Sequence, residues 1–149
     1  MRSTLSPKTT VGRQSLLFSL MIAVVLAPSC KSGPPLAEHE DEALARTEFT
    51  DRIENFFEYE PLRAGKPSQF LIHLTDLSDG TPVEKAEVIL ITRTKGGSEV
   101  TQTKARVGKV TGIYVADLTI PGSGDYDIEF HIRNAKLDER LPLKDFKVE

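Results

Sequence analysis

The sequence feature that most constrains the fold is the period-two alternation of apolar and polar residues in short segments beyond residue 46. In Asp125–Arg133 every second side chain is apolar, and this set comprises Tyr126, Ile128, Phe130 and Ile132. Such a period places the apolar set on one face of a β-strand. No stretch between residues 47 and 149 sustains a helical period, so the folded part is expected to be all-β.

Similar segments, separated by turns rich in Gly and Pro, predict the remaining strands. They are Thr47–Thr50, Ile53–Glu60, Ser68–Leu77, Ala86–Thr94, Glu99–Val107, Ile113–Ile120 and Lys144–Glu149. Ala86–Thr94 is almost continuously apolar and is expected at the centre of a sheet, whereas Glu99–Val107 and Lys144–Glu149 are expected at edges. About seven strands in roughly 100 residues is the size of an immunoglobulin-like β-sandwich, which we predict for residues 47–149.

Tyr126 is the candidate structural residue of this sandwich. It follows Gly124 and Asp125 at the start of the predicted penultimate strand. In a tyrosine corner, a Tyr at this place donates a hydrogen bond from its hydroxyl group back to the preceding loop. The alternative is a core aromatic ring whose hydroxyl group lies at the rim.

Residues 1–29 have the features of a bacterial signal peptide. Three basic residues precede the apolar run Leu16–Ala27, which is shorter than the ~20 residues that span a bilayer. The run ends in Ala27-Pro28-Ser29-Cys30, which resembles a lipoprotein cleavage site whose cysteine takes a diacylglycerol. We therefore expect a periplasmic protein anchored to the membrane through lipidated Cys30, with Lys31 favouring the outer membrane. The alternative is an ordinary secretory signal followed by an incidental cysteine.

Residues 30–46 are predicted to form an acidic, flexible tether. Gly33, Pro34 and Pro35 oppose regular structure, and the four acids that follow favour water. His39 lies among these acids and is a weak candidate for binding a divalent cation.

Composition excludes several functions for the exported part. From Cys30 onward, 16 bases (19 less the three in the leader) face 22 acids, a net charge of −6. This balance argues against nucleic-acid binding. No catalytic constellation, cofactor motif or small-molecule site is recognisable, and we expect no enzyme activity and no cofactor. His73 and His131 are expected on opposite sheets, too far apart to share a metal; the acid pairs Asp76/Asp79 and Asp138/Glu139 leave calcium binding open.

Three stretches resemble a known family. They are Phe56–Phe70, the segment His73–Leu77 with Pro82-Val83, and Gly112-Ile113-Tyr114 with Gly122–Tyr126. They are similar to the N-terminal immunoglobulin-like domain of periplasmic adaptor (membrane fusion protein) subunits of heavy-metal RND efflux systems, and more distantly to YtkA-like domains. In that family an acidic, often His-containing tether also follows a lipidated cysteine.

The resemblance implies a non-catalytic module that interacts with an efflux or envelope protein. Adaptors of the family continue into a lipoyl-like domain, a helical hairpin and a β-barrel, and these parts do not follow in this sequence, so bridging of pump and channel is not carried over. The alternatives are a weak periplasmic metal-ion buffer that uses His39 and a truncated adaptor subunit. Surface carbohydrate binding through Tyr59 and Tyr114 is disfavoured because the chain has no Trp.

Overall fold

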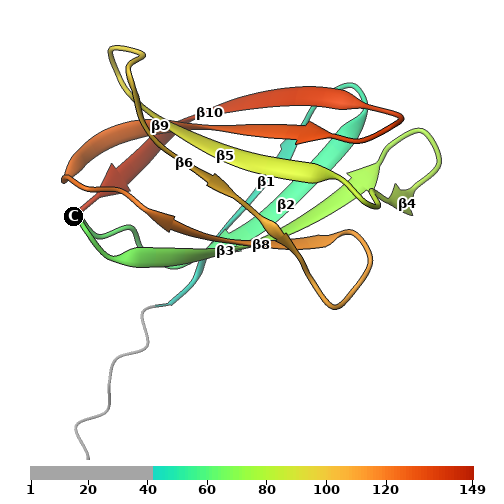
Figure 1. Ribbon diagram of the computed structural model, residues 1–149, viewed down its shortest axis with the longest axis horizontal. Helices are drawn as coiled ribbons and strands as arrows, with labels where there is room; N and C mark the ends of the chain where they lie inside the picture. The colour runs from blue at the N-terminus through green and yellow to red at the C-terminus, as the bar shows by residue number, and fades with distance from the viewer. Residues whose placement is uncertain (1–41) are drawn as a thin grey trace, which may run out of the picture. The chain divides into compact units, whose positions relative to one another are not determined.

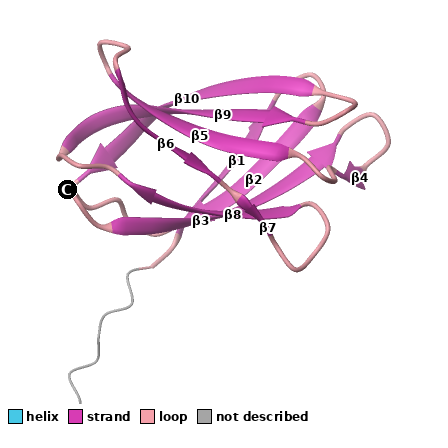
Figure 2. Cartoon of the chain, viewed as in Figure 1, coloured by secondary structure: helices cyan, strands magenta, loops and turns pink. Residues whose placement is uncertain are grey.

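The computed structural model describes residues 42–149, which form ten β-strands and no helix (Figures 1 and 2). The strands are β1 (Leu44–Phe49), β2 (Ile53–Tyr59), β3 (Pro67–Asp76), β4 (Thr81–Pro82), β5 (Glu87–Thr94), β6 (Glu99–Lys104), β7 (Arg106–Val107), β8 (Ile113–Thr119), β9 (Gly124–Arg133) and β10 (Asp138–Val148). They pair into two antiparallel sheets that pack face to face, which confirms the predicted all-β sandwich.

The two sheets follow an immunoglobulin-like order. Sheet A has the order β1-β2-β3-β8-β7 with β4 paired to β3, and sheet B has the order β10-β9-β5-β6. The chain therefore crosses between the layers from β4 to β5, from β6 to β7 and from β8 to β9, as in immunoglobulin-like domains. In Figure 1 sheet B forms the upper layer, and β3 and β8 lie below it. The expected central position of Ala86–Thr94 is confirmed by β5, which lies between β9 and β6.

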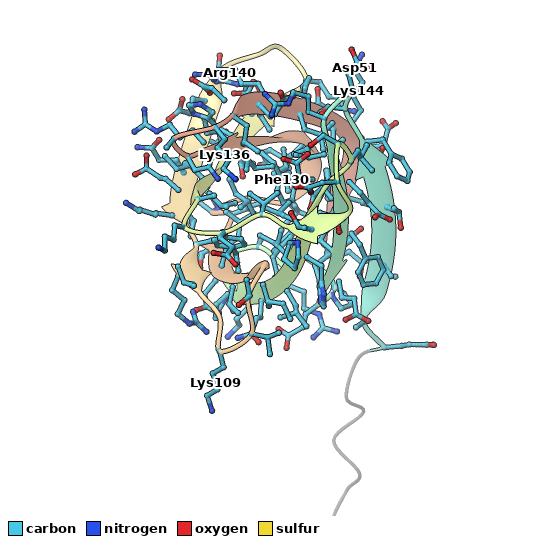
Figure 3. All side chains as sticks on the ribbon, turned by 90° about the vertical axis from the view of Figure 1, so that its right-hand side faces the viewer. Asp51, Lys109, Phe130, Lys136, Arg140 and Lys144 are labelled. Atoms are coloured by element: carbon cyan, nitrogen blue, oxygen red, sulfur yellow. The ribbon has the colours of Figure 1, made fainter. Side chains whose placement is uncertain are left out.

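Aromatic side chains from both sheets fill the core. Phe57 of sheet A lies with its ring centroid 4.9 Å from that of Phe130 in sheet B and 6.0 Å from that of Phe70. All three are completely buried, and the other inward residues at alternate positions of β3, β5 and β9 are buried as well. Phe130 lies inside the sandwich in Figure 3. This burial of apolar surface is the main source of stability in a domain without a disulfide.

The predicted strand Glu99–Val107 is divided between the two sheets. β6 pairs with β5 in sheet B, and Ala105 donates a backbone hydrogen bond to Val88 of β5 at 2.8 Å. Arg106 and Val107 then pair with Val115 and Tyr114 in sheet A. The chain thus passes from one layer to the other at Ala105. This division, and the two-residue β4, account for the larger number of strands than predicted.

The last strand begins at Asp138, well before the predicted start at Lys144. A bulge between Leu143 and Phe146 interrupts its pairing with β9, and Asp145 adopts a left-handed conformation with φ 67° there. The bulge shifts the inward positions from Leu141 and Leu143 to Phe146 and Val148. Because the alternation changes phase, the sequence signal stops at the bulge.

β1 begins at Leu44, inside the stretch assigned to the tether. The residues of β1 that face the core are Arg46 and Glu48, both half-buried. The strand therefore lacks the alternation of apolar and polar residues from which a strand is predicted. The Arg46 guanidinium group lies 4.8 Å from the centroid of the Phe146 ring and donates a hydrogen bond to the Lys144 carbonyl oxygen at 3.0 Å. Arg46 therefore covers the core between the edge strands β1 and β10.

Candidate interaction surface

The sequence singles out three site residues, Cys30, His39 and Tyr126, and the structure describes Tyr126. Its hydroxyl group donates a hydrogen bond to the Gly122 carbonyl oxygen at 3.0 Å, in the loop that precedes β9. The bond back to the preceding loop expected of a tyrosine corner is therefore present. Cys30 and His39 lie outside the described residues, and so do the signal peptide and most of the tether.

The two histidines lie on the outer sides of opposite sheets, as predicted. His73 belongs to β3 of sheet A, where its ring meets the Phe56 ring edge-on with centroids 5.4 Å apart. His131 belongs to β9 of sheet B, and its Nε2 lies 2.7 Å from Oδ1 of Asp138. Residues 42–149 contain no group of three or more His, Cys, Asp or Glu residues that could hold a metal ion.

The outer face of sheet B is covered by ion pairs between neighbouring strands. Glu87 of β5 binds Lys104 of β6 at 2.7 Å and also binds Arg133 of β9. Arg140 of β10 binds Glu129 of β9 at 2.7 Å. Further ion pairs on this face join Arg93 to Glu99 and Lys95 to Asp127, and His131 forms a hydrogen bond with Asp138 there. Ile89 and Ile91 lie between these charges. We call this surface the ion-pair face.

Two members of these ion pairs, Glu87 and Lys95, have shifted pKa values. Hydrogen bonds from Lys104 and Arg133 hold the pKa of Glu87 below its ordinary value. Hydrogen bonds to Asp145 and Asp127 raise the pKa of Lys95. Both shifts favour the charged forms. The ion-pair face therefore satisfies its own charges and leaves few of them for a partner.

The outer face of sheet A is apolar at its centre. Residues paired across antiparallel strands share a face, and Phe56 of β2 pairs with His73 of β3, which pairs with Ile113 of β8. In the next row, Leu71 of β3 pairs with Val115 of β8. Phe49 of β1 extends the surface and is 60% exposed. We call this surface the apolar face; its apolar residues are Phe49, Phe56, Leu71, Ile113 and Val115.

Acidic residues border the apolar face on the β2 side. Glu54 and Glu58 flank Phe56 on the same side of β2, and neither makes an ion pair within residues 42–149. On the opposite border Asp117 accepts hydrogen bonds from Arg106 at 2.5 Å and from Gln69 at 3.1 Å. An apolar centre with a polar rim is the usual anatomy of a protein–protein interface.

A second candidate is an open cleft of about 580 Å³ at one end of the sandwich, between the β3–β4, β4–β5 and β9–β10 loops. Lys136, which lines it, lies at this end in Figure 3. Asn134 ties two of the loops together by donating to the Glu84 carbonyl oxygen at 3.0 Å. The cleft is therefore bordered by loops that are hydrogen-bonded to one another.

The acid pair Asp76/Asp79 lies at this cleft, and both carboxylates are already used by their own turns. Asp76 accepts hydrogen bonds from the Ser78 amide and hydroxyl groups, and Asp79 accepts the same two from Thr81. These bonds lower the pKa of both acids. They explain the acids as turn formers. The other acid pair, Asp138/Glu139, begins β10 of sheet B, where Oδ1 of Asp138 lies 2.7 Å from Nε2 of His131.

Sequence reasoning missed the apolar face. The signal was present, because Phe56, Leu71, Ile113 and Val115 are large apolar residues at outward positions of amphipathic strands. Phe56 follows directly before the core residue Phe57, and Leu71 lies between the core residues Phe70 and Ile72. Such pairs extend the apolar run and obscure the alternation. Only the register shows that the outward members come together on one surface.

Comparisons with known proteins add no relative. No protein-family model, no curated protein and no solved structure matches the chain. Within residues 42–149 there is also no helix that would be long and apolar enough to cross a membrane.

Proposed function

We propose that this chain is a membrane-tethered module of the cell envelope that binds a protein partner and carries out no catalysis. Lipidated Cys30 anchors it, residues 31–43 separate the sandwich from the membrane, and the apolar face binds the partner. The sequence resemblance to the first domain of efflux adaptors supports a partner in an efflux or other envelope assembly.

The difference between the two outer faces carries the proposal. Sheet B pairs its charges across neighbouring strands. The centre of the outer face of sheet A instead presents the apolar side chains of Phe49, Phe56 and Leu71. A contiguous exposed apolar patch on a folded domain is typical of an interaction site. Burying this patch against a partner would gain free energy without the cost of separating ion pairs.

The chemistry of the partner follows from the border of the patch. Glu54 and Glu58 are acids without an ion pair inside the described part of the chain. A partner with an apolar patch flanked by Lys or Arg would match both the centre and the border. Charge complementarity of this kind raises the rate of association and sets the orientation of the partner.

Site-directed photo-crosslinking in intact cells tests the binding surface. A photo-reactive residue at position 71 is compared with one at position 89, since Leu71 and Ile89 are both half-buried outward residues of inner strands on opposite faces. We expect a discrete heavier adduct, identified by mass spectrometry as an envelope protein, from position 71 alone. Equal adducts from both positions, or none from position 71, would contradict the proposed surface.

Metabolic labelling with radioactive palmitate tests the anchor separately. The native chain should incorporate label and fractionate with membranes, and Cys30→Ala should lose both properties because no other cysteine is present. Label retained in Cys30→Ala, or absent from the native chain, would remove the lipid anchor from the proposal. Neither result depends on the crosslinks at position 71.

A further inference from the structure

Among residues 42–149, β1 is the edge strand whose blocking features a second copy of the chain could neutralise, because these features are two inward-pointing charges of opposite sign, Arg46 and Glu48. Natural edge strands carry Pro, Lys, bulges or very short lengths. β10 has Pro142, a bulge and two lysines, β7 has two residues, and β6 continues across to the other sheet at Ala105. β1 has six residues, Leu44–Phe49, with no Pro, no Lys and no bulge, and among the strands of residues 42–149 it pairs with β2 alone.

The sequence of β1 is complementary to itself in one antiparallel register. We propose that two copies of this chain pair through β1, with a two-fold axis at Thr47. In this register Arg46 lies opposite Glu48 of the second copy, and Glu48 lies opposite Arg46 of the second copy. Opposite charges directly across two strands are favourable. The Thr47 residues of the two copies lie opposite each other at the axis, and Ala45 lies opposite Phe49 of the second copy.

The neighbouring registers are unfavourable. A two-fold axis through Arg46 would place two arginines opposite each other, and an axis through Glu48 would place two glutamates opposite each other. Like charges in directly opposed positions are destabilising. The axis at Thr47 also keeps the greatest length of strand in contact. Within one chain Arg46 already binds Glu48 at 2.6 Å, so pairing would join the two ion pairs into a network of four charges.

Pairing at this edge would leave the apolar face open. Residues on one side of β1 continue onto the same side of the second β1, so Phe49 of each copy lies next to Ala45 of the other on the outer side of the joined sheets. The two apolar faces would then lie side by side on one continuous sheet. The proposal does not depend on the proposed function, because it concerns the edge of sheet A and a second copy of the chain.

Disulfide crosslinking tests the axis. The full chain carrying Cys30→Ser, purified in detergent, receives Thr47→Cys, or Gln102→Cys in the middle of the β6 edge as the matched control. Residues at the axis would bring their Cα atoms to about 4.5–5.5 Å, within the range that a disulfide bond spans. Mild oxidation should yield dimers from Thr47→Cys at several times the rate seen for Gln102→Cys. Equal rates would overturn the proposal.

Exchanging the charges tests the register, and mixing the two variants shows whether each of them is still folded. Arg46→Glu places acids opposite acids, and Glu48→Arg places bases opposite bases, so each variant alone should dimerise about tenfold more weakly in sedimentation experiments. In a mixture of the two variants every opposed pair is again of opposite charge. The mixture should form heterodimers with about the affinity of the native homodimer. A native chain that stays monomeric, or a mixture no tighter than either variant alone, would overturn the proposal.

Discussion

Tyr114 joins the two sheets through its hydroxyl group. It belongs to β8 of sheet A and is 1% exposed. Its hydroxyl group donates a hydrogen bond to the Val83 carbonyl oxygen at 2.7 Å and accepts one from the Ala86 amide at 3.0 Å, just before β5 of sheet B. These two bonds position the segment that crosses from sheet A to sheet B.

Tyr114→Phe should therefore destabilise the domain more than Tyr126→Phe. Removing the Tyr114 hydroxyl group leaves a buried donor and a buried acceptor unpaired, which should lower the free energy of unfolding by about 2–3 kcal/mol. Tyr126→Phe removes one partly buried hydrogen bond, which should lower the free energy of unfolding by about 1 kcal/mol. Urea unfolding followed by circular dichroism measures both free energies. An equal loss in the two variants would show that the Tyr114 hydroxyl group does not hold the crossing segment.

Asn55 is a polar side chain at a core position of β2. It is completely buried, and neither its amide nitrogen nor its amide oxygen has a hydrogen-bond partner within the described part of the chain. Burial of an amide without partners costs about 1–3 kcal/mol. Asn55→Leu, which is similar in size, should therefore raise the free energy of unfolding by about 1 kcal/mol or more.

The same urea titration tests Asn55→Leu, with Thr92→Val as a second case. Thr92 is also completely buried, and its hydroxyl group lacks a partner within residues 42–149. Both changes should shift the unfolding midpoint upward. A lower midpoint for Asn55→Leu would mean that the amide makes hydrogen bonds that the fold depends on, to ordered water above all.

At the scale of residues, the sequence could reveal the core but not the polar groups within it. The alternation in β3 and β9 identifies Phe70, Ile72 and Phe130 as inward residues. Tyr126 was recognisable because its place in the chain matches a known motif. Tyr114 was recognisable as inward only, since its partners Val83 and Ala86 are distant in sequence. Such hydrogen bonds depend on how the sheets pack, which a pattern in one strand does not contain.

At the scale of elements, Gly112 fixes the contact between the β7–β8 loop and strands β3 and β4. Its φ is +79°, and its backbone passes so close to its neighbours that an added Cβ would lie 2.6 Å from Cβ of Pro82 and 3.2 Å from the Leu74 carbonyl oxygen. The Gly112 carbonyl oxygen accepts a hydrogen bond from the Leu74 amide at 2.9 Å. A side chain at this position would disrupt this corner of sheet A.

Gly112→Ala should therefore be much more damaging than Gly97→Ala. Gly97 has a similar φ of +85°, but an added Cβ would meet nothing within 4 Å. Gly97→Ala should cost about 1–2 kcal/mol from the left-handed backbone alone. Gly112→Ala adds a steric clash and should cost about 1–3 kcal/mol more. Thermal unfolding of both variants provides the comparison, and similar melting temperatures would rule out a tight corner at Pro82.

Sequence patterns locate strands better where a strand keeps one phase. β2, β3, β5, β8 and β9 lie within about one residue of their predicted bounds, because each keeps the same face toward the core throughout. β10 changes phase at the bulge, β6 and β7 change sheet at Ala105, and β1 covers the core with polar residues. Each exception follows from a contact with another strand, and so only the folded structure shows it.

At the scale of the whole molecule, the two outer faces differ in what stabilises them. The ion-pair face depends on charges, and its members cover sheet B from β6 to β10. The apolar face depends on packing between side chains of adjacent strands. The sequence predicted the two-layer arrangement, but not this division, because charged residues occur at outward positions in both sheets. The division arises from the register, which aligns opposite charges in one sheet and apolar side chains in the other.

The ion-pair face should make the domain sensitive to acid. Glu87 has a lowered pKa in the folded state because of hydrogen bonds from Lys104 and Arg133. The unfolded chain therefore takes up a proton at this carboxyl group at higher pH than the folded chain does. The stabilisation from Glu87 is complete above the ordinary pKa of 4.5 and is lost as the pH falls through the lower, folded value.

Glu87→Gln should accordingly unfold at a lower urea concentration than the native chain at pH 7, and its midpoint should fall less steeply between pH 5 and pH 3. Glu54→Gln is the matched control, since Glu54 also lies outward on a strand but makes no ion pair within residues 42–149. It should keep the native slope. High salt should reduce the difference between Glu87→Gln and the native chain, because these pairs are exposed to solvent and therefore screened. A Glu87→Gln midpoint that falls as steeply as the native one would mean that the carboxylate contributes nothing to the pH dependence of folding.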